Sequence, residues 1–579
     1  MESVRKKHID SVKWILITLI LLLYPLTHIS DGIDLWDGGY NYANFKFSGL
    51  AHMDSMWYFA TWLANQVGSF FTALPYGSTC IGMNVYTGLV ISAMSLTAFF
   101  FCVRKLHMPS ILVLTGQLIA ISLCWAPSGM LYSYLTYAFI LVATIFLYLG
   151  LIEDKNSYLV IAGVVLGWNV AVRFSNLVQM GLILAVWGYG VIDRKKIRRV
   201  LQQTGFCIAG YVGALGTFLG IMAWKYGLGN YIEGILRLFQ MTEQADDYSP
   251  GWMLLGMVWA YYDCLYFLKR FALALIIGIL FCVLLPASWK KTKKGITIAI
   301  MAILSIWLIQ NRFCSGDYAS YTSIYYPCVT VLTLTLCLSF YQLIDRKASG
   351  ENKLLGILLM LTILITSLGG NNAIYSSMNN LFLVLPGFLW LVWGLCKENK
   401  CIRVFPVQCL LLVAIGFLLV QSVRFDRKFV YEEAAGEWDL TYRVEKIPVL
   451  KGMKTNPQKA EALESLYQYI TDNGLQDKKC ILYGEIPGVA YYMDLEPAMN
   501  IWSDLRSYHY KIMEQDLKAV SPRPVIIMTT ECSQYVSGEA EEDLFWDKSM
   551  EDKMNLLCSY IEDNQFVLTF QNDKFAIYE

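Results

Sequence analysis

The stretch His28–Tyr40, which reads HISDGIDLWDGGY, is the first long polar segment in a chain dominated by apolar runs. It follows a single apolar run of spanning length and carries three aspartates at equal spacing, Asp31, Asp34 and Asp37. Its glycines favour an irregular loop over a helix, and the Gly-Gly pair after Asp37 would let the backbone approach a ligand closely. On spacing alone, solvated acidic residues that cap an interfacial helix are an equally good interpretation.

The composition identifies the chain as a membrane protein. It has 579 residues, of which 56% are hydrophobic and 16% charged, and its mean hydropathy is +0.44. A soluble protein of this size needs more polar surface. The 46 basic residues balance the 46 acidic ones, and we find no basic patch that indicates nucleic acid. The 15 cysteines show no CxxC pair and no metal-ligand spacing, so we infer neither a zinc site nor a disulfide framework.

Apolar windows of roughly spanning length recur along the chain and predict about thirteen transmembrane helices. The first follows a basic flank and lacks a small-x-small cleavage site, so it is expected to be a retained helix that also acts as a signal anchor. The windows lie at about 14–29, 80–103, 109–126, 131–151, 158–172, 177–192, 203–224, 266–286, 295–312, 326–344, 354–369, 378–396 and 402–423.

The distribution of Lys and Arg among the loops predicts the orientation. Alternate connections, beginning with Arg104 and Lys105, hold most of the basic residues, and short basic loops stay in the cytoplasm. The N-terminus is therefore expected inside, and the loop 30–79, the connection 225–265 and the tail after about residue 424 on the outer face. The lack of a eukaryotic targeting pattern favours a bacterial plasma membrane.

The tail differs in composition from the rest, so we predict two domains: a transmembrane domain, 1–424, and a small extracytoplasmic α/β domain, 425–579. The tail contains no GxGxxG and no P-loop, and therefore no visible nucleotide site. Its expected elements are a helix at 457–470 closed by Gly474, strands at 480–483 and 525–529, and a hairpin of 566–571 with 574–578.

Arg173 is a candidate functional residue because it lies between two short apolar runs, near the predicted outer boundary of the membrane. A cation there is costly unless it has a partner, and a lipid phosphate is the natural one. Snorkelling of the side chain to the headgroup region is the alternative.

Two further outer segments are candidates for ligand contact. The turn 367–380 offers amides and a phenol, chiefly Asn371, Asn372 and Tyr375, that suit a carbohydrate or phosphate, although an ordinary polar turn is an equally good interpretation. The segment 231–262 has the character of a lid beside a cavity, with an amphipathic interfacial helix as its alternative.

Together these motifs resemble the GT-C class of polytopic glycosyltransferases, which includes the dolichyl-phosphate-mannose protein mannosyltransferases and the catalytic subunit of oligosaccharyltransferase. The resemblance covers most of the chain and rests on the first-loop motif Asp37–Tyr40, on Gly163 and Gly167 before Arg173, and on LYGEIPGVAYYM at 482–493. It implies a catalytic acidic residue in the first outer loop and a sugar donor carried on polyprenyl phosphate.

Carried onto this sequence, the resemblance implies that Asp37 is the catalytic base and that Arg173 contacts the donor phosphate. Gly38 follows Asp37 where some members have a second acidic residue, which leaves Asp34 and Asp54 as competitors. Tyr40 and Asp54 join the expected substrate-binding residues. We expect no cofactor, because no residues form a convincing site for a divalent metal. The carboxylate pair of Asp37 and Asp54 stays open as the alternative.

The implied reaction moves a sugar from a polyprenyl-phosphate donor lipid to a glycan, cell-envelope polymer or protein on the outer face. One alternative is a ligase or polymerase that uses a lipid-diphosphate glycan. A second is a transporter or flippase of lipid-linked precursors, which predicts charges at mid-bilayer and inverted repeats. The charges cluster instead at the boundaries of the apolar windows.

Overall fold

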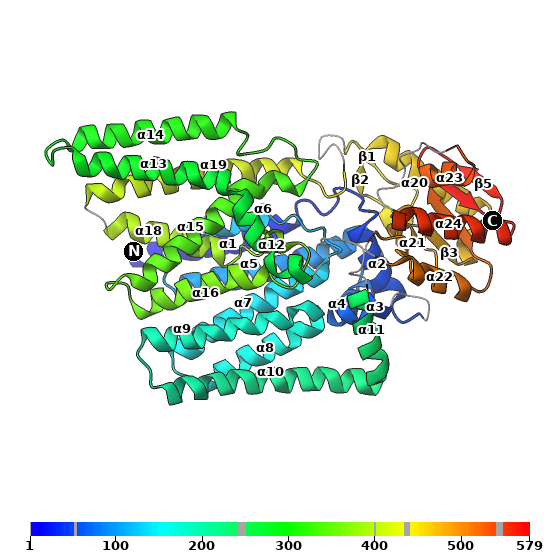
Figure 1. Cartoon of the computed structure of the whole chain (residues 1–579), viewed down its shortest axis with the longest axis horizontal. Coiled ribbons are helices and arrows are strands. Elements are labelled where there is room, and N and C mark those ends of the chain that lie inside the picture. The colour runs from blue at the N-terminus through cyan, green and yellow to red at the C-terminus, as the bar shows by residue number, and fades with distance from the viewer. Residues whose placement is uncertain are drawn as a thin grey trace.

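A computed structural model of the chain describes residues 2–50, 55–240, 250–398, 401–433, 440–506, 508–539 and 548–579. Long helices form a bundle, and a mixed α/β domain sits at one end of it (Figure 1). The chain starts in the bundle with α1 (Glu2–Leu23) and ends in the α/β domain, so the two termini lie far apart. Residues 440–579 are called the C-terminal domain below.

A helix covers most of every apolar window, which confirms the prediction of an α-helical multi-pass membrane protein. In the described part of the chain, eight helical segments are long and apolar enough to cross a membrane, and α17 with α18, bent by 75°, adds a ninth. Besides α1, the bundle contains α5 (Cys80–Arg104), α6 (Ser110–Ser122), α7 (Leu131–Ile152), α8 (Asn156–Val172), the 3-10 helix η2 (Phe174–Ile183) with α9 (Leu184–Ile192), α10 (Ile197–Lys225), α13 (Leu265–Leu284), α14 (Lys290–Gln310), α15 (Tyr325–Ile344), α16 (Gly350–Thr366), α17 (Ala373–Asn379), α18 (Val384–Glu398) and α19 (Phe405–Lys428).

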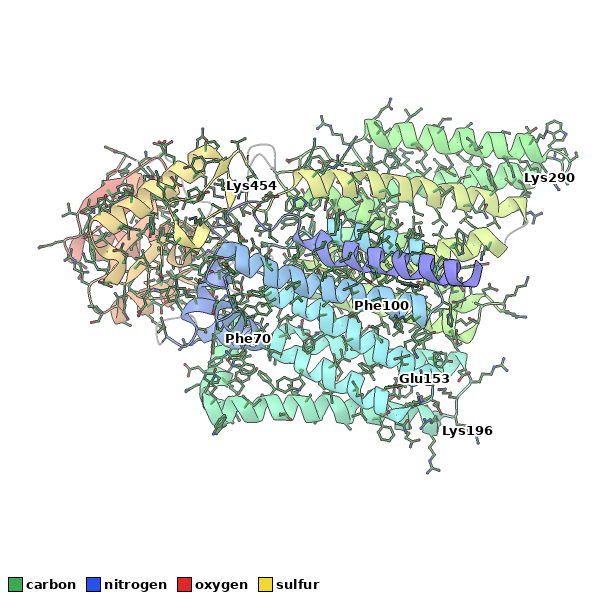
Figure 2. All side chains as sticks on the ribbon, turned by 180° about the vertical axis from the view of Figure 1, so that it is seen from behind. Phe70, Phe100, Glu153, Lys196, Lys290 and Lys454 are labelled. Carbon is green, nitrogen blue, oxygen red and sulfur yellow. The ribbon has the colours of Figure 1, made fainter. Side chains whose placement is uncertain are left out.

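The two ends of the bundle are formed by different loops. Glu153, Lys196 and Lys290 lie at the end remote from Lys454 and Phe70 (Figure 2). The first-loop helices and α11 gather at the other end, beside the C-terminal domain (Figure 1). These helices are α2 (Asp37–Phe47), α3 (Ser55–Ala60), α4 (Trp62–Thr72) and α11 (Leu228–Gln240).

The segment 231–262 consists of α11 and α12 (Pro250–Asp263), joined by residues outside the described part. In α11, Ile232 and Leu236 are exposed at one-turn spacing, which is the pattern of an amphipathic interfacial helix. In α12, the Trp252 indole donates a hydrogen bond of 2.9 Å to the Asn371 carbonyl. The segment thus borders the 367–380 turn.

The C-terminal domain has the small α/β fold that the tail predicts. Its four-stranded sheet has the order β3-β4-β6-β5, with β3 parallel to β4 and the other pairs antiparallel. The predicted helix, strands and hairpin are all present, and Gly474 closes the helix in the left-handed conformation. The elements are β1 (Tyr442–Arg443), β2 (Lys454–Thr455), α20 (Pro457–Asp472), β3 (Cys480–Tyr483), α21 (Gly488–Tyr492), α22 (Tyr510–Ala519), β4 (Val525–Thr529), α23 (Thr530–Val536), α24 (Lys548–Asp563), β5 (Leu568–Gln571) and β6 (Phe575–Tyr578).

The expectation that the first-loop glycines form an irregular loop is wrong at its centre, because α2 begins at Asp37 and contains Gly38 and Gly39. These glycines allow close packing of protein against protein. A Cβ at Gly39 would lie 2.4 Å from the Cα of Gly488 in α21, and a Cβ at Gly129 would lie 2.4 Å from the Cα of Gly38. The start of α2 is thus closely packed between α21 of the C-terminal domain and the loop after α6.

Replacement of Gly39 by Ala is expected to destabilise the docking of α2 on α21. The new methyl group meets backbone, which cannot move aside as a side chain can, and overpacking of this kind costs about 1–3 kcal/mol. Thermal unfolding of the purified protein measures the effect. Gly213→Ala in α10 is the matched control, because no atom lies within 4 Å of its added Cβ. Equal melting temperatures for the Gly39 variant and the native chain would contradict the packing described.

Candidate active site

Asp37 lies in the first turn of α2, where the helix dipole favours a carboxylate. Its Oδ2 accepts a hydrogen bond of 2.8 Å from the hydroxyl of Tyr431, which follows α19. The residue is half-buried, so the carboxylate lies inside the protein without being sealed off. Arg173 acts on it electrostatically from the bundle.

Arg173 lies at the junction where α8 ends and η2 begins. Gly163 and Gly167 bring α8 close to α10, since a Cβ on either glycine would lie within 2.5 Å of an α10 carbonyl oxygen. After the junction, the Asn176 amide donates to Thr136 Oγ1 at 2.7 Å and to the Asn169 carbonyl at 3.0 Å. This buried network fixes the turn that carries the arginine.

The Arg173 guanidinium faces the predicted ligand turn. It lies 5.2 Å from the centre of the Tyr132 ring, a cation–π distance. A Cβ at Gly370 would lie 3.4 Å from its Nη2, so the turn passes beside the charge. The structure therefore brings together Asp37, Arg173 and the 367–380 turn, three segments that are far apart in the sequence.

The carboxyl groups of Asp34 and Asp37 form an electrostatically coupled pair. Burial raises the pKa of Asp37 above its ordinary value, while the Tyr431 hydroxyl and Arg173 oppose the rise. Burial and the neighbouring charge of Asp37 raise the pKa of Asp34 to about 8, against hydrogen bonds from the Gly38 and Trp36 amides. Arg173 acts on Asp37, whereas the charges of Asp37 and Glu432 both act on Asp34, so the surroundings favour the ionised form at Asp37 more than at Asp34.

The raised pKa of Asp34 predicts a pH-dependent stability. The native chain keeps this proton up to about pH 8, whereas an unfolded aspartate releases it near its ordinary pKa of 3.8. The native state binds more protons in this window, so its stability falls as the pH rises through it. Thermal unfolding should be measured between pH 5 and 8, about the window of these two pKa values. Over this range the melting temperature should fall less in Asp34→Asn than in the native chain. The control is Asp193→Asn, at an exposed loop residue at the remote end of the bundle, and its melting temperature should fall with pH as much as that of the native chain. An equal fall in Asp34→Asn and in the native chain would contradict the raised pKa of Asp34.

The residues of the 367–380 turn lie near an aromatic wall. Tyr375 packs edge-on against Tyr321 at 5.2 Å, and Tyr321 stacks on Trp125 at 4.3 Å. The Trp125 indole donates a 3.0 Å hydrogen bond to the Tyr375 carbonyl. Asn371 and Asn372 are half-buried at the start of α17, beside Gly370. The Tyr321 hydroxyl is within electrostatic range of Asp37, so this wall borders the site.

The remaining candidates lie elsewhere or outside the described residues. Tyr40 is 5% exposed, and its ring lies 5.1 Å from that of Trp502 in the C-terminal domain. Asp54 belongs to residues 51–54, outside the described part. Within the described residues, no group of three or more His, Cys, Asp or Glu is arranged to hold a metal ion.

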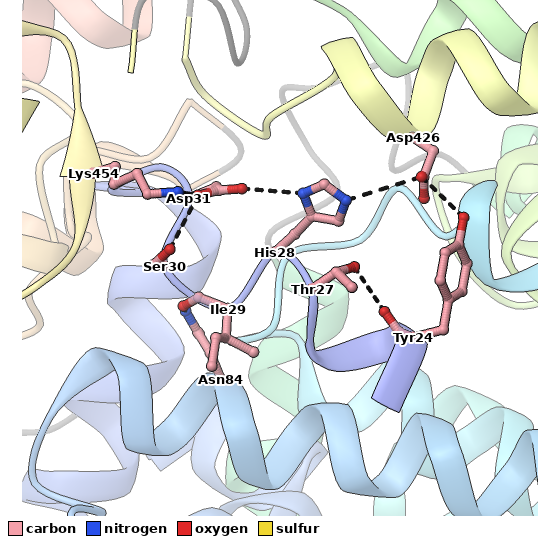
Figure 3. Close-up of polar contacts among 9 residues, drawn as sticks. All are labelled: Tyr24, Thr27, His28, Ile29, Ser30, Asp31, Asn84, Asp426 and Lys454. Atoms are coloured by element: carbon pink, nitrogen blue, oxygen red, sulfur yellow. Dashed lines mark hydrogen bonds and ion pairs between the residues drawn. The ribbon is translucent and has the colours of Figure 1, made fainter. Parts of the chain in front are cut away.

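Asp31, the first of the three aspartates, belongs to a polar chain that ties the C-terminal domain to the bundle (Figure 3). Lys454 Nζ lies 2.9 Å from its Oδ1, and His28 Nδ1 lies 3.0 Å from its Oδ2. His28 Nε2 is 3.9 Å from Asp426, which accepts a hydrogen bond of 2.9 Å from Tyr24. Although burial acts to raise it, the hydrogen bonds of His28 and Lys454 lower the pKa of Asp31 to about 2.

Three site residues after α19 escape sequence reasoning: Tyr431, Glu432 and Glu433. Burial and the charge of Asp37 act to raise the pKa of Glu432, while Lys459 opposes them. Glu433 is 2% exposed and accepts hydrogen bonds from the Ile33 amide at 3.0 Å and from Lys459 at 3.2 Å. The signal in the sequence is an acidic pair, Glu432 and Glu433, a few residues after the last apolar window.

The fold and the site together define a polytopic membrane protein with a carboxylate–arginine centre between its helix bundle and a C-terminal α/β domain. No protein-family model and no curated protein matches the chain. Similar solved structures include the Archaeoglobus fulgidus oligosaccharyltransferase in complex with Zn and sulfate, with TM-score 0.46, 11% identity, and 92% of this chain and 70% of that chain covered.

The same oligosaccharyltransferase tethered to an acceptor peptide gives TM-score 0.45 at 12% identity over 98% of this chain and 74% of that chain. ArnT from Cupriavidus metallidurans, bound to undecaprenyl phosphate, gives TM-score 0.41 at 9% identity over 98% and 97% of the two chains. At such low identity, function has to come from the residues of the site.

Proposed function

We propose that the chain is a membrane glycosyltransferase that moves a sugar from a polyprenyl-phosphate donor to an acceptor on the outer face of the plasma membrane. The acceptor is a glycan, a cell-envelope polymer or a protein. In this orientation the N-terminus is cytoplasmic and the C-terminal domain extracytoplasmic, as the loop charges predict.

The observation that carries the proposal is the meeting of Asp37 and Arg173 at one site near the C-terminal domain. Transfer from a lipid phosphate needs a base for the incoming hydroxyl and a cation for the departing phosphate. Arg173 lies close enough to Asp37 to act on it electrostatically, which favours the ionised form of this carboxyl group, and in the proposed reaction Asp37 carries the charge. A fixed guanidinium matches phosphate oxygens better than an ammonium group does.

The proposed reaction is a direct displacement at the anomeric carbon. Asp37 takes the proton of the acceptor hydroxyl as its oxygen forms a bond to that carbon. The bond from the anomeric carbon to the phosphate oxygen breaks, and its electron pair leaves with the polyprenyl phosphate. Arg173 stabilises the negative charge that develops there. Tyr431 holds the Asp37 carboxylate in place by the hydrogen bond of 2.8 Å.

A donor panel tests the proposal and separates it from the alternative ligase. The protein is reconstituted in lipid nanodiscs with polyprenyl-monophosphate sugars or polyprenyl-diphosphate glycans, together with alkyl glycosides as acceptors. We expect glycosyl transfer with release of polyprenyl phosphate. Transfer only from diphosphate donors would favour the ligase. Movement of intact donor between leaflets of proteoliposomes without transfer would favour a flippase.

A further inference from the structure

A cavity of about 200 Å³ lies between the bundle and the C-terminal domain, next to Asp37. Gly38, which follows Asp37 in the chain, lines it, and so does Tyr431, which donates the hydrogen bond to Asp37. Asp34 lines it as well. Arg173 is not among the described lining residues. The cavity therefore adjoins the proposed base without including the proposed phosphate-binding cation.

The ionised groups that line this cavity are the carboxylates of Asp31 and Asp426. Asp34 also lines it but holds a proton near neutral pH. His28 is a further lining residue, and no Lys or Arg is among the described ones. Lys454 lies beside Asp31 but is engaged by it at 2.9 Å. A phosphate or carboxylate group in this space would face the carboxylates of Asp31 and Asp426 without a free Lys or Arg among the described lining residues, and such like-charge contact disfavours anionic ligands.

The size and the remaining surface of the cavity suit one sugar ring. A cavity of about 150 Å³ is large enough to hold benzene, so this one has room for a single ring-sized group. Trp125 and Tyr492 supply aromatic surface, and Ser122 and Asn84 supply polar groups. Apolar surface with a few polar groups that fix orientation is the usual make-up of a small-molecule site.

We propose that this cavity is the acceptor site and that it takes a single hydroxyl-bearing, sugar-sized group that is neutral or positively charged. Charge thus separates the two substrates: the donor phosphate goes to Arg173 and the acceptor group to the carboxylate-lined cavity. Between them, Asp37 can reach the acceptor hydroxyl. Calling the occupant an acceptor rests on the proposed function, whereas the binding and its charge preference do not.

Saturation-transfer difference NMR on the protein in nanodiscs tests the proposal with three probes that differ at one position. These are methyl glucoside, methyl 6-amino-6-deoxyglucoside and methyl glucoside 6-phosphate, at millimolar concentrations and pH near 7. We expect signals from the first two and none from the phosphate. Ile121→Trp, which fills the cavity, should remove the signals. Ile161→Trp, on an exposed bundle surface, should leave them unchanged.

Two further variants make the test specific. Asp426→Asn removes one cavity charge and keeps the size of the side chain, so the preference for the amino over the neutral glycoside should fall several-fold. Asp37→Asn should still bind the probes even though it is expected to lose transfer, which separates failure of the site from failure of the proposed function. Signals that persist in Ile121→Trp, stronger binding of the phosphate, or no signal from any probe would each overturn the proposal.

Discussion

Asp37→Asn is expected to lose at least about a hundredfold in glycosyl transfer, because general-base catalysis contributes about 10²–10⁴-fold in enzymes. The amide keeps the shape of the side chain and can still accept the Tyr431 hydroxyl bond, but it cannot take a proton. Stability should be equal or higher, since an ionised carboxylate no longer has to be buried. Single-turnover transfer from a polyprenyl-phosphate sugar measures the chemical step.

Asp34→Asn is the matched comparison for that variant. The raised pKa of Asp34, about 8, leaves its side chain protonated near neutral pH, so a neutral side chain there resembles the working state. The variant gives up one accepted backbone hydrogen bond, which is worth about 1 kcal/mol. Even if all of this energy were lost from the transition state, transfer should stay within about tenfold of the native chain, because 1.4 kcal/mol is a factor of ten in rate. The reverse order, an active Asp37→Asn and an inactive Asp34→Asn, would exchange the roles of the two aspartates.

Arg173→Gln is expected to weaken both donor binding and the rate of transfer. Removal of one group that stabilises developing charge costs about 10²–10³-fold in kcat in enzymes, and loss of the phosphate contact should raise the KM for the donor. Arg173→Lys should restore part of the activity, because a point charge remains without the planar fork of donors. Steady-state kinetics at varied donor concentration separates the two effects.

Arg270→Gln controls for general attraction between cationic protein and anionic lipid. Arg270 is exposed and lies 5.3 Å from the centre of the Trp307 ring, in the first turns of α13. Its removal should leave the donor KM within about twofold, because exposed charges are screened by salt. Unchanged donor kinetics in Arg173→Gln would show that this arginine only snorkels.

The sequence predicts the fold well because membrane helices and short strands leave strong local patterns. Apolar windows give the bundle, and turn residues such as Gly474 give the boundaries in the C-terminal domain. The start of α2 at Asp37 could not be predicted, because local propensity argues against Gly38 and Gly39 in a helix. Gly38 packs against Gly129, and Gly39 packs against Gly488, in segments that are distant in the sequence. These tertiary contacts stabilise the first turn of α2 in spite of its low helix propensity.

The candidate site is predictable only in part. Asp37 and Arg173 carry chemistry that is visible in the sequence, and their roles stay proposals. Their proximity depends on how α2 and α8 pack, which no local pattern encodes. Tyr431 gives no signal at all, since one tyrosine among 37 is unremarkable until its hydroxyl meets Asp37. Likewise, the equal spacing of Asp31, Asp34 and Asp37 could not show which of them has a catalytic role. In the structure, Lys454 lies beside Asp31 and Arg173 acts on Asp37, so the two have different surroundings.

A density map of the protein in nanodiscs with undecaprenyl phosphate, the lipid product common to every sugar on that carrier, tests the central claim most directly. The account predicts the phosphate beside the Arg173 guanidinium, with the space where a sugar would attach facing Asp37. It also predicts that Arg173→Gln removes this density while Arg270→Gln keeps it. A phosphate bound away from Arg173, or density that is unchanged in Arg173→Gln, would contradict the account.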